Sequence, residues 1–444
     1  MEFGKHLNKG IWGLADKALP VVYGLGYVLL VIRVLPEEEF GNWTLLQEIF
    51  LLVSGLITAF ALNPLLKFAA EDQSDTRETV TIAVTMQVGF TVLAAAVILL
   101  LRSALGELLH SRQIEVLLTY FPAMLIASFI RNLALVVLQA RFRVRELFFT
   151  DAVHFVGAPF LTWVMSRMHQ FNAAIDLVHV NIISLACSSV VGLLFTWRAM
   201  IFTRHLTIGS MKKMWNYGSY SLGGNVSSLF STRADSFLLA AFTGPLQVAV
   251  YNSVKIFTRA YDMVSQVVQM FLLPAASQLS SRGEKSSLKI VVEKSLLFGA
   301  VGMIPVMLGF IVVGGPMVHI IYQGKYLEAV PQLSVFGLMA VFVPISAVAS
   351  SVLMGIGEAR RGFVIGVKAL AGAVVLYLIL IPLFGLTGAT VGYVLSAVLL
   401  AYLSLRGMTD YVPVAAGEVL RRWGDINTFV RRTIEKLLRG AGEQ

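Results

Sequence analysis

The sequence predicts an all-α polytopic membrane protein with about 12 transmembrane helices. Of its 444 residues, 57% are hydrophobic and only 14% are charged, whereas about a quarter of the residues are charged in soluble globular proteins. The apolar residues gather in stretches of about 18 to 28 residues, which are long enough to cross the roughly 30 Å hydrocarbon core as helices. Strands of a membrane barrel would be about half as long. The excess apolar surface must therefore face lipid.

Twelve stretches meet this length criterion, and only short connections separate them. The longest connections have about 15 to 20 residues, too few for a folded extramembrane domain. Many membrane enzymes carry a large catalytic loop outside the bilayer, so we expect this protein not to be an enzyme. The expected spans are residues 18–35, 44–63, 79–101, 116–138, 147–166, 176–197, 217–241, 248–273, 295–316, 331–354, 363–384 and 388–405.

The net charge of +9 is distributed unevenly between the two sides of the membrane. If the N-terminus is cytoplasmic, 24 of the 35 Lys and Arg residues fall on the cytoplasmic side and 5 on the other. The positive-inside rule then predicts that both termini are cytoplasmic, in agreement with an even number of spans. The hydropathy excludes the other class that such a charge suggests, a basic nucleic-acid-binding protein.

A weak internal repeat divides the chain into halves. A shift of 210 residues superposes Asn42 on Asn252 and Pro64 on Pro274, and each proline ends the second span of its half. Transporters are often built from such repeats. We predict an N-terminal six-helix lobe at 1–210, a C-terminal six-helix lobe at 211–407, and a cytoplasmic basic tail at 408–444.

The tail contains a further helical pattern at about 416–439. Apolar residues recur there at steps of three and four, and Arg and Lys residues occupy the other faces. This pattern is typical of a basic amphipathic helix on the inner leaflet, where anionic lipid would bind it. A solvated basic tail is the alternative.

The eighth span carries a stripe of six polar residues on one helical face. Ionisable residues in spans usually face a bundle interior or a water-filled cavity. Alternatively, Asp262 neutralises Arg259 one turn away, and the stripe is a seam packed against another helix. One acid cannot neutralise two cations, so we expect a cavity lining with net positive charge. The stripe consists of Asn252, Lys255, Arg259, Asp262, Gln266 and Gln269.

The seventh span repeats the pattern with smaller side chains, and Arg233 lies at the edge of its stripe. Cavity lining and close helix packing explain the hydroxyl groups equally well. We expect a functional role for Asp235, whose carboxylate would be costly to bury in lipid. The stripe consists of Ser221, Asn225, Ser228, Thr232 and Asp235.

The first half offers fewer ionisable residues in its spans. Asp151 and His154 are three residues apart on one face of the fifth span, a spacing that permits a proton-sensitive pair. The alternative is a satisfied contact between helices. Arg131 has no acid within one turn, so we expect it to face the cavity, and Glu48 in the second span is a further candidate.

No motif for nucleotide binding, hydrolysis or metal binding is present. The chain has no P-loop, Gly-x-Ser-x-Gly or His-Glu-x-x-His motif, and its single cysteine, Cys187, excludes an intrachain disulfide. We therefore expect no cofactor and no metal site. Energy for uphill transport would come from an ion gradient, with a proton or a sodium ion as the candidate coupling ion.

Four short motifs resemble one family. In chain order they are Arg33-Val-Leu-Pro-Glu-Glu-Glu-Phe-Gly41, Asp235 to Gly244 followed by Val250-Tyr251-Asn252, Leu273-Pro-Ala-Ala-Ser-Gln-Leu279, and Gly385-Leu-Thr-Gly-Ala-Thr390. They are similar to motifs of the Wzx-type polysaccharide flippases, in the multidrug/oligosaccharidyl-lipid/polysaccharide (MOP) exporter superfamily. The resemblance runs over essentially the whole chain. Ala249 and Val250 depart from the glycine that the family has before Tyr251, and the tail is longer and more basic than the family requires.

The resemblance implies a MATE-like fold of two six-helix lobes around a central cavity, with alternating access. It also implies a cargo, an oligosaccharide on a polyprenyl diphosphate, which is moved from the cytoplasmic to the external leaflet of a bacterial inner membrane for surface polysaccharide biosynthesis. Other polysaccharide-assembly proteins are candidate partners.

An anionic lipid diphosphate suits a cationic site, because Arg binds phosphate through paired donors. We assign Arg131, Arg233, Lys255 and Arg259 to the diphosphate, and Asn225, Asn252, Gln266 and Gln269 to glycan hydroxyls. The candidates for ion coupling are Asp235, Asp262, Asp151, His154 and Glu48.

Two rival functions remain. A MATE-type cation-coupled drug exporter would need an acidic cavity, whereas the candidate residues give this cavity a net positive charge. A non-transporting scaffold could recruit glycan-assembly enzymes through the basic tail, but six aligned polar residues in lipid would be costly for it.

Overall fold

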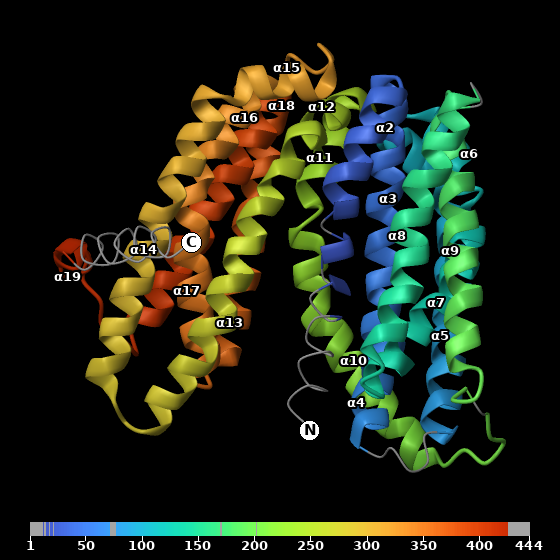
Figure 1. Ribbon diagram of the computed structural model, residues 1–444, viewed down its shortest axis with the longest axis horizontal. Coiled ribbons are helices and arrows are strands. Elements are labelled where there is room, and N and C mark those ends of the chain that lie inside the picture. Colours follow the sequence, from blue (N-terminus) through green and yellow to red (C-terminus); the bar gives the residue numbers. More distant parts are fainter. Residues whose placement is uncertain are drawn as a thin grey trace, which may run out of the picture. The chain divides into compact units, whose positions relative to one another are not determined.

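Every regular element in the described part of the chain is a helix (Figure 1). The computed structural model describes residues 12, 15–16, 18–20, 22–71, 77–168, 171–200 and 202–424. The predicted all-α class is confirmed. Of the amphipathic helix predicted at 416–439, α19 (Ala416–Arg421) is seen, and the part beyond residue 424 lies outside the described residues.

Within these residues, eight helices are long and apolar enough to cross a bilayer. One of them, α18, covers two expected spans, 363–384 and 388–405, because it is kinked at Gly385 (φ +55°), just after Pro382. The eight are Glu37–Ala69 (α3 Glu37–Ile57, η2 Thr58–Leu62 and α4 Asn63–Glu71), α5 (Arg77–Leu108), α7 (Phe121–Ala140), α8 (Val144–Arg167), α9 (Ala174–Thr196), α14 (Lys285–Val312), Ala329–Gly355 (α16 Ala329–Leu338, η4 Met339–Val341 and α17 Phe342–Gly355) and α18 (Ala359–Thr409).

The other three expected spans, 18–35, 217–241 and 248–273, correspond to interrupted helices. Backbone groups freed by a break need partners within the membrane, so such breaks occur where protein or water surrounds the chain. The pieces are η1 (Tyr23–Tyr27) with α2 (Val28–Val34), α10 (Ile208–Ser231) with α11 (Ala234–Thr243), and α12 (Pro245–Lys255) with η3 (Ile256–Thr258) and α13 (Arg259–Ser281). Two short helices, α6 (Arg112–Leu118) and α15 (Gly314–Tyr322), complete the set.

Contacts divide the chain into two compact units. The first extends to Ile256 and includes Ile321–Lys325, and the second consists of Phe257–Ile320 and the chain from Tyr326 onward. The contact boundary at Ile256 falls later than the boundary after residue 210 that the spans suggest. The division into two six-helix lobes remains a prediction.

In the first unit, α7 packs against α9, and α3 packs against α12. Glycine permits the closest approaches. A Cβ on Gly41 of α3 would lie 2.0 Å from the carbonyl oxygen of Pro245, and one on Gly218 of α10 would lie 2.2 Å from that of Phe60. Gly41 belongs to the Pro-Glu-Glu-Glu-Phe-Gly motif, and in this chain its missing side chain lets the backbones of α3 and α12 approach closely.

In the second unit, α17 packs between α13 and α18 around a core that includes Leu272, Val292 and Val352. The start of the tail is attached to α14 by ion pairs. Glu293 is only 2% exposed and receives Arg422 at 2.8 Å, while Lys289 lies 2.8 Å from Glu418. These pairs hold α19 against the helix.

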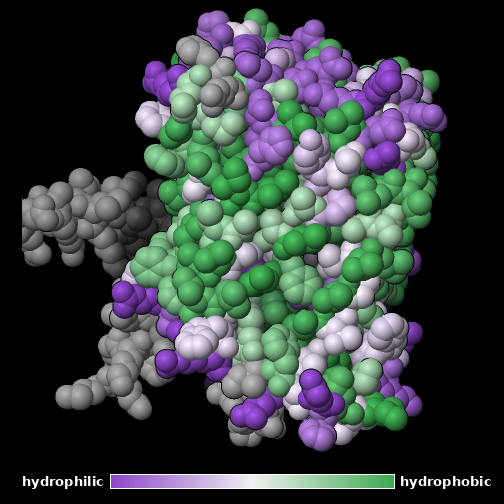
Figure 2. All heavy atoms as spheres, turned by 90° about the vertical axis from the view of Figure 1, so that its right-hand side faces the viewer, coloured by the Kyte–Doolittle hydropathy of each residue, from purple (hydrophilic) through white to green (hydrophobic). Residues whose placement is uncertain are grey.

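The surface has the polarity of a membrane protein. On the face that Figure 2 shows, hydrophobic side chains fill the middle and hydrophilic ones gather towards the two ends. Long apolar side chains such as Val92 and Leu100 of α5 and Leu194 of α9 are exposed. A band of exposed apolar residues between polar ends matches the hydrocarbon core of a bilayer.

Candidate functional site

The site begins at the break between α10 and α11. Thr232 ends α10, and its hydroxyl turns back to bond the carbonyl of Leu229 at 3.1 Å. Arg233 follows with non-helical backbone angles and donates from Nη1 to the same carbonyl at 3.2 Å and to the Thr232 hydroxyl at 2.8 Å. Carbonyl groups at the end of a helix have no hydrogen-bond partner within the helix. The Arg233 side chain provides a donor for one of them, the Leu229 carbonyl.

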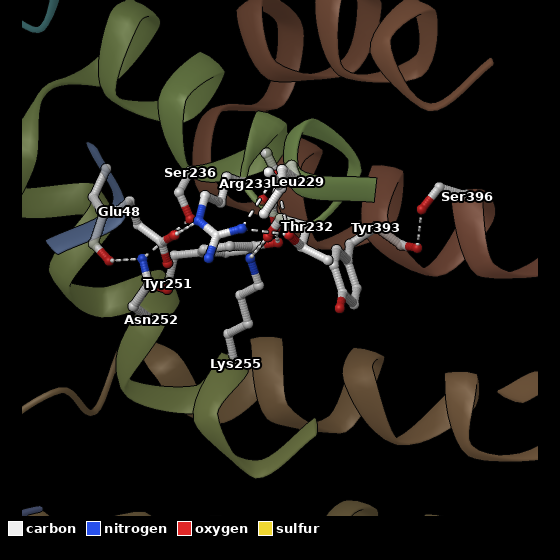
Figure 3. Close-up of polar contacts among 12 residues, drawn as sticks. Glu48, Leu229, Thr232, Arg233, Ser236, Tyr251, Asn252, Lys255, Tyr393 and Ser396 are labelled. Atoms are coloured by element: carbon white, nitrogen blue, oxygen red, sulfur yellow. Dashed lines mark hydrogen bonds and ion pairs between the residues drawn. The ribbon is translucent and has the colours of Figure 1, made fainter. Parts of the chain in front are cut away.

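Arg233 also forms an ion pair with Glu48 of α3. Its Nε atom lies 2.9 Å from Oε2 of the carboxylate, and both side chains are largely buried. Figure 3 shows the two residues approaching from different helices. The pair joins α3 to the start of α11.

A second ion pair lies beside the first, and its acid is fully buried. Asp235 has 0% exposure, and its Oδ2 atom receives Nζ of Lys255 at 2.6 Å and the hydroxyl of Tyr251 at 2.6 Å. A buried carboxylate is tolerated only when it is paired and hydrogen-bonded. Its other oxygen, Oδ1, has no hydrogen-bond partner among the described residues.

Asn252 of α12 lies next to these two ion pairs. Its amide donates to the carbonyl of Val248 at 3.1 Å and to the hydroxyl of Ser236 at 3.4 Å (Figure 3). We name as the paired cluster the six residues Glu48, Arg233, Asp235, Tyr251, Asn252 and Lys255, all of which belong to the first unit.

Two of the expected cations have acidic partners that the sequence did not reveal. The sequence suggested a net positive cavity, because one acid on the eighth span cannot neutralise two cations. In the structure Glu48 pairs with Arg233 and Asp235 pairs with Lys255, so the cluster is formally neutral. The partners come from α3 and α11, which spacing along α12 cannot reveal.

The stripe on the eighth span is also divided. We expected one continuous helix, but the 3₁₀ turn η3 separates α12, which carries Asn252 and Lys255, from α13. The remaining stripe residues lie on α13 in the second unit, where Arg259, Gln266 and Gln269 have exposed side chains. Exposed glutamines in a span favour water or a polar ligand over lipid. The backbone position of Asp262 is described, but its side chain lies outside the described part.

One residue of the stripe on the seventh span, Ser221, bonds to a neighbouring helix in the first unit. Asn63 donates from its amide to the Ser221 hydroxyl at 2.9 Å, and Asn225 donates to the carbonyl of Ser221 in its own helix at 2.8 Å. These contacts favour the packing alternative for Ser221. A glycan-binding role for Asn225 stays a prediction.

The first-half candidates also have partners on neighbouring helices. Arg131 of α7 forms an ion pair with Asp151 of α8, and His154 bonds through Nδ1 to the hydroxyl of Ser184 on α9 at 3.0 Å. No acid lies within one turn of Arg131 on its own helix, but the adjacent helix supplies one. That Arg131 faces the cavity stays a prediction. Asp151 and His154 thus bond to partners on two different helices. This arrangement favours the alternative in which each residue makes a contact between helices. Their coupling roles remain predictions.

Sequence reasoning missed the position of one side chain in the cluster. Tyr251 was noted only as part of a family motif, yet it donates to the buried Asp235 and lies with its ring 5.5 Å from Nζ of Lys255. A signal was present in the sequence, because Tyr251 and Lys255 are four residues apart on one helical face.

The long apolar helices identify a multi-pass membrane protein, and its fold is that of solved structures of the MOP superfamily. Two solved structures show the same fold. The lipid II flippase MurJ in an inward closed conformation superposes with a TM-score of 0.74 over 96% of this chain and 92% of its own, at 12% identity. An inward-facing MATE family multidrug resistance transporter gives 0.68 over 90% and 98%, at 14% identity.

The family follows from the sequence match. A model of the family described as "Polysaccharide biosynthesis protein" matches residues 30–331, more than half of the chain, so the chain belongs to that family. Among curated relatives, an uncharacterized membrane protein, MJ1068, of Methanocaldococcus jannaschii is 27% identical over 44% of this chain and 38% of its own. The probable low-salt glycan biosynthesis flippase Agl15 of Haloferax volcanii is 24% identical over 66% and 61%. These alignments cover less than two thirds of either relative.

Proposed function

We propose that this protein is a flippase that moves a polyprenyl-diphosphate-linked oligosaccharide from the cytoplasmic to the external leaflet of the cytoplasmic membrane, by alternating access. The observation that carries the proposal is the paired cluster, in which Arg233 and Lys255 are held on internal carboxylates within the membrane spans of a polysaccharide biosynthesis family member. The relative named as a probable glycan biosynthesis flippase supports the same cargo class.

Binding would proceed by exchange of anions. A diphosphate carries negative charge and acceptor oxygens, so it can take the places that the Glu48 and Asp235 carboxylates occupy beside Arg233 and Lys255. Each cation keeps an anionic partner in the low-dielectric interior throughout. The internal carboxylates hold the cations in position before the cargo arrives.

The displaced carboxylates would in turn need a positive charge. The Oδ1 atom of Asp235 has no hydrogen-bond partner among the residues described, so it can accept a proton or coordinate a sodium ion. Neutralising Asp235 would release Lys255 to the diphosphate. This exchange would couple an ion gradient to the movement of cargo, and it makes Asp235 the principal candidate for ion coupling.

The helix breaks supply the flexibility that alternating access requires. The turn η3 (Ile256–Thr258) lies where the chain passes from the first contact unit to the second. Hinges are formed by a few residues at element ends that absorb changes in backbone angles. Beyond this turn, Arg259, Gln266 and Gln269 would meet the diphosphate and the glycan, while the lipid chain stays in the bilayer.

The remaining parts of the proposal concern placement and partners. We propose that both termini are cytoplasmic, as the charge distribution predicts, and that the basic tail contacts anionic lipid of the inner leaflet. Polysaccharide-assembly proteins are proposed as further partners. The drug-exporter alternative stays open, because the formally neutral cluster no longer argues against it.

The test follows surface polysaccharide and lipid-linked oligosaccharide in cells depleted of the protein and complemented with variants. Arg233→Gln with Lys255→Gln should abolish surface glycan and leave the lipid-linked intermediate accessible only to a cytoplasmic probe. Lys285→Gln, which changes an exposed lysine at the start of α14, is the matched control and should complement fully.

Two results would contradict the proposal. Near-normal glycan in the double variant, at a normal level of protein in the membrane, would show that the paired cluster does not handle the cargo. Normal glycan in depleted cells, together with increased retention of cationic dyes, would support the drug exporter instead.

A further inference from the structure

Two helices of the first unit carry lysine and aromatic side chains next to the ends of their expected spans. Lys67 follows the expected span 44–63, and Lys213 precedes the expected span 217–241. An even number of expected spans precedes each lysine, so the expected topology places both on the cytoplasmic side. Their helices, α4 and α10, pack against each other near the lower edge of Figure 1. We name as the lysine–aromatic cluster the four residues Lys67, Phe68, Lys213 and Tyr217.

Each lysine of this cluster lies over a ring of the opposite helix. Nζ of Lys67 is 4.5 Å from the ring centroid of Tyr217, and Nζ of Lys213 is 4.3 Å from that of Phe68. The two rings meet edge to face, with centroids 5.6 Å apart. An aromatic face attracts a cation through the ring quadrupole. These contacts therefore restrict the positions of two side chains that are otherwise flexible.

The two ammonium groups are close enough to repel each other. Nζ of Lys67 is also 5.4 Å from the centroid of Phe68, so both charges lie beside one ring. They are thus within about 10 Å of each other, roughly one Debye length at 0.1 M salt. Both side chains are exposed, and Lys67 forms no ion pair with a described residue. Two like charges held together favour the binding of an anion beside them.

The backbones meet closely next to the cluster, which fixes its arrangement. A Cβ on Gly218, the residue after Tyr217, would lie 2.2 Å from the carbonyl oxygen of Phe60. One helical turn before Lys67, Asn63 donates from its amide to the hydroxyl of Ser221 at 2.9 Å. Side chains on two helices that pack this tightly are positioned before a ligand arrives.

The cluster lies at the level expected for lipid head groups. Trp215 and Tyr220 are exposed on the same part of α10, and exposed Trp and Tyr side chains are enriched where a span meets the head-group region. The cytoplasmic leaflet carries a negative surface potential from its anionic lipids, which attracts lysines next to a span. An anion that belongs to a lipid is therefore already concentrated where the two ammonium groups lie.

We propose that the lysine–aromatic cluster binds the phosphate head group of an anionic lipid in the cytoplasmic leaflet. The lysines provide the charge, and the two rings hold them in place. The site is separate from the paired cluster and from the basic tail. It does not depend on which cargo the protein moves.

The test measures which lipid lies beside the cluster, with full-length protein in phosphatidylcholine vesicles. In a Cys187→Ser background, Tyr220→Cys carries a single fluorophore on the face of α10 that also presents Lys213 and Tyr217. Nitroxide-labelled phosphatidylglycerol should quench this fluorophore more strongly than nitroxide-labelled phosphatidylcholine. Lys67→Gln with Lys213→Gln should lower the association of phosphatidylglycerol relative to phosphatidylcholine roughly 30-fold, the combined effect of two lysines near anionic lipid.

Three double variants separate the cluster from the overall charge. Lys67→Arg with Lys213→Arg keeps both charges and should retain the preference. Phe68→Leu with Tyr217→Leu removes the rings and should lower the preference about fivefold. Arg282→Gln with Lys285→Gln removes two exposed cations from the second unit and should have no effect.

Unlabelled competitors identify the source of the phosphate. Displacement of the labelled lipid by phosphatidylglycerol would assign the site to a phospholipid, and stronger displacement by a polyprenyl diphosphate would assign it to a diphosphate lipid. Displacement by inorganic phosphate at matched ionic strength would overturn the proposal, because the site would then bind a free anion. Equal quenching by the two labelled lipids, or an equal loss in Arg282→Gln with Lys285→Gln, would overturn it as well. The assay measures no transport, so its result is independent of the flippase proposal.

Discussion

Replacing Asp235 with asparagine removes a buried carboxylate that forms an ion pair with Lys255 in the paired cluster. The parent carboxylate is fully buried and accepts from Lys255 and Tyr251, both at 2.6 Å. An amide of the same shape keeps one acceptor for Tyr251 but carries no charge. The variant therefore leaves the ammonium group in the interior without its counterion.

The expected loss of stability is about 3 to 5 kcal/mol, the usual cost of removing one partner of a buried ion pair. Lys255 is 13% exposed, so partial hydration places the value near the lower end. Asp235→Asn combined with Lys255→Met removes both charges, and its loss should be much smaller, because apolar replacement of a buried pair is often close to neutral. The departure of the two changes from additivity measures the interaction energy between Asp235 and Lys255.

Reversible unfolding in mixed detergent micelles measures these free energies. The matched control is Asp410→Asn, which removes the partner of Arg361 in an exposed pair with 39% and 54% exposure. That change should cost less than about 1 kcal/mol. The reasoning is refuted if Asp235→Asn is as stable as the parent, or if the double variant is no more stable than the single one.

Two further predictions concern other parts of the chain. Gly41→Ala places a Cβ 2.0 Å from the carbonyl oxygen of Pro245, so it should lower the free energy of unfolding by about 1 to 3 kcal/mol in the same assay. Gly89→Ala is the control, because its Cβ meets open space, and it should leave the free energy of unfolding unchanged. Equal effects of the two changes would contradict the close approach of α3 and α12. The backbone N–H and hydroxyl of Thr207 lower the pKa of the Glu78 carboxyl. A lowered pKa stabilises the folded state above the unfolded pKa, and this contribution disappears as the pH falls through the lowered folded value. Limited proteolysis of the segment before α10 should accelerate in that range for the parent and be independent of pH in Glu78→Gln; a parent with no acceleration would contradict the contact.

Much of the fold could be predicted from the sequence, because the bilayer acts on each span separately. A helix that crosses the hydrocarbon core must be long and apolar, and this condition can be read from one segment at a time. Eight of the helices described fulfil it, and α18 contains two expected spans joined at Gly385. The breaks in 217–241 and 248–273 were not predicted, because hydropathy does not report backbone angles.

The candidate site was predicted as a set of residues and not as an arrangement. Glu48, Arg233, Asp235, Asn252 and Lys255 were all selected, because ionisable and amide groups within spans are costly and few. Their pairing was missed. Spacing along a helix shows which residues share a face, but not which helix packs against that face. The two pairs make the paired cluster formally neutral, and a net positive charge of the whole cavity lining, which would include Arg259, stays a prediction.

By itself, the sequence determined that the chain is an α-helical multi-pass membrane protein and which polar groups its spans contain, since both follow from local composition and the cost of burying charge. Only the tertiary structure decided that Arg131 pairs with Asp151, that Lys255 pairs with Asp235, and that Arg233 pairs with Glu48. Each pair joins two different helices, and its formation depends on which helix faces pack together. An ion pair requires two groups within about 4 Å, a distance that only the folded arrangement specifies.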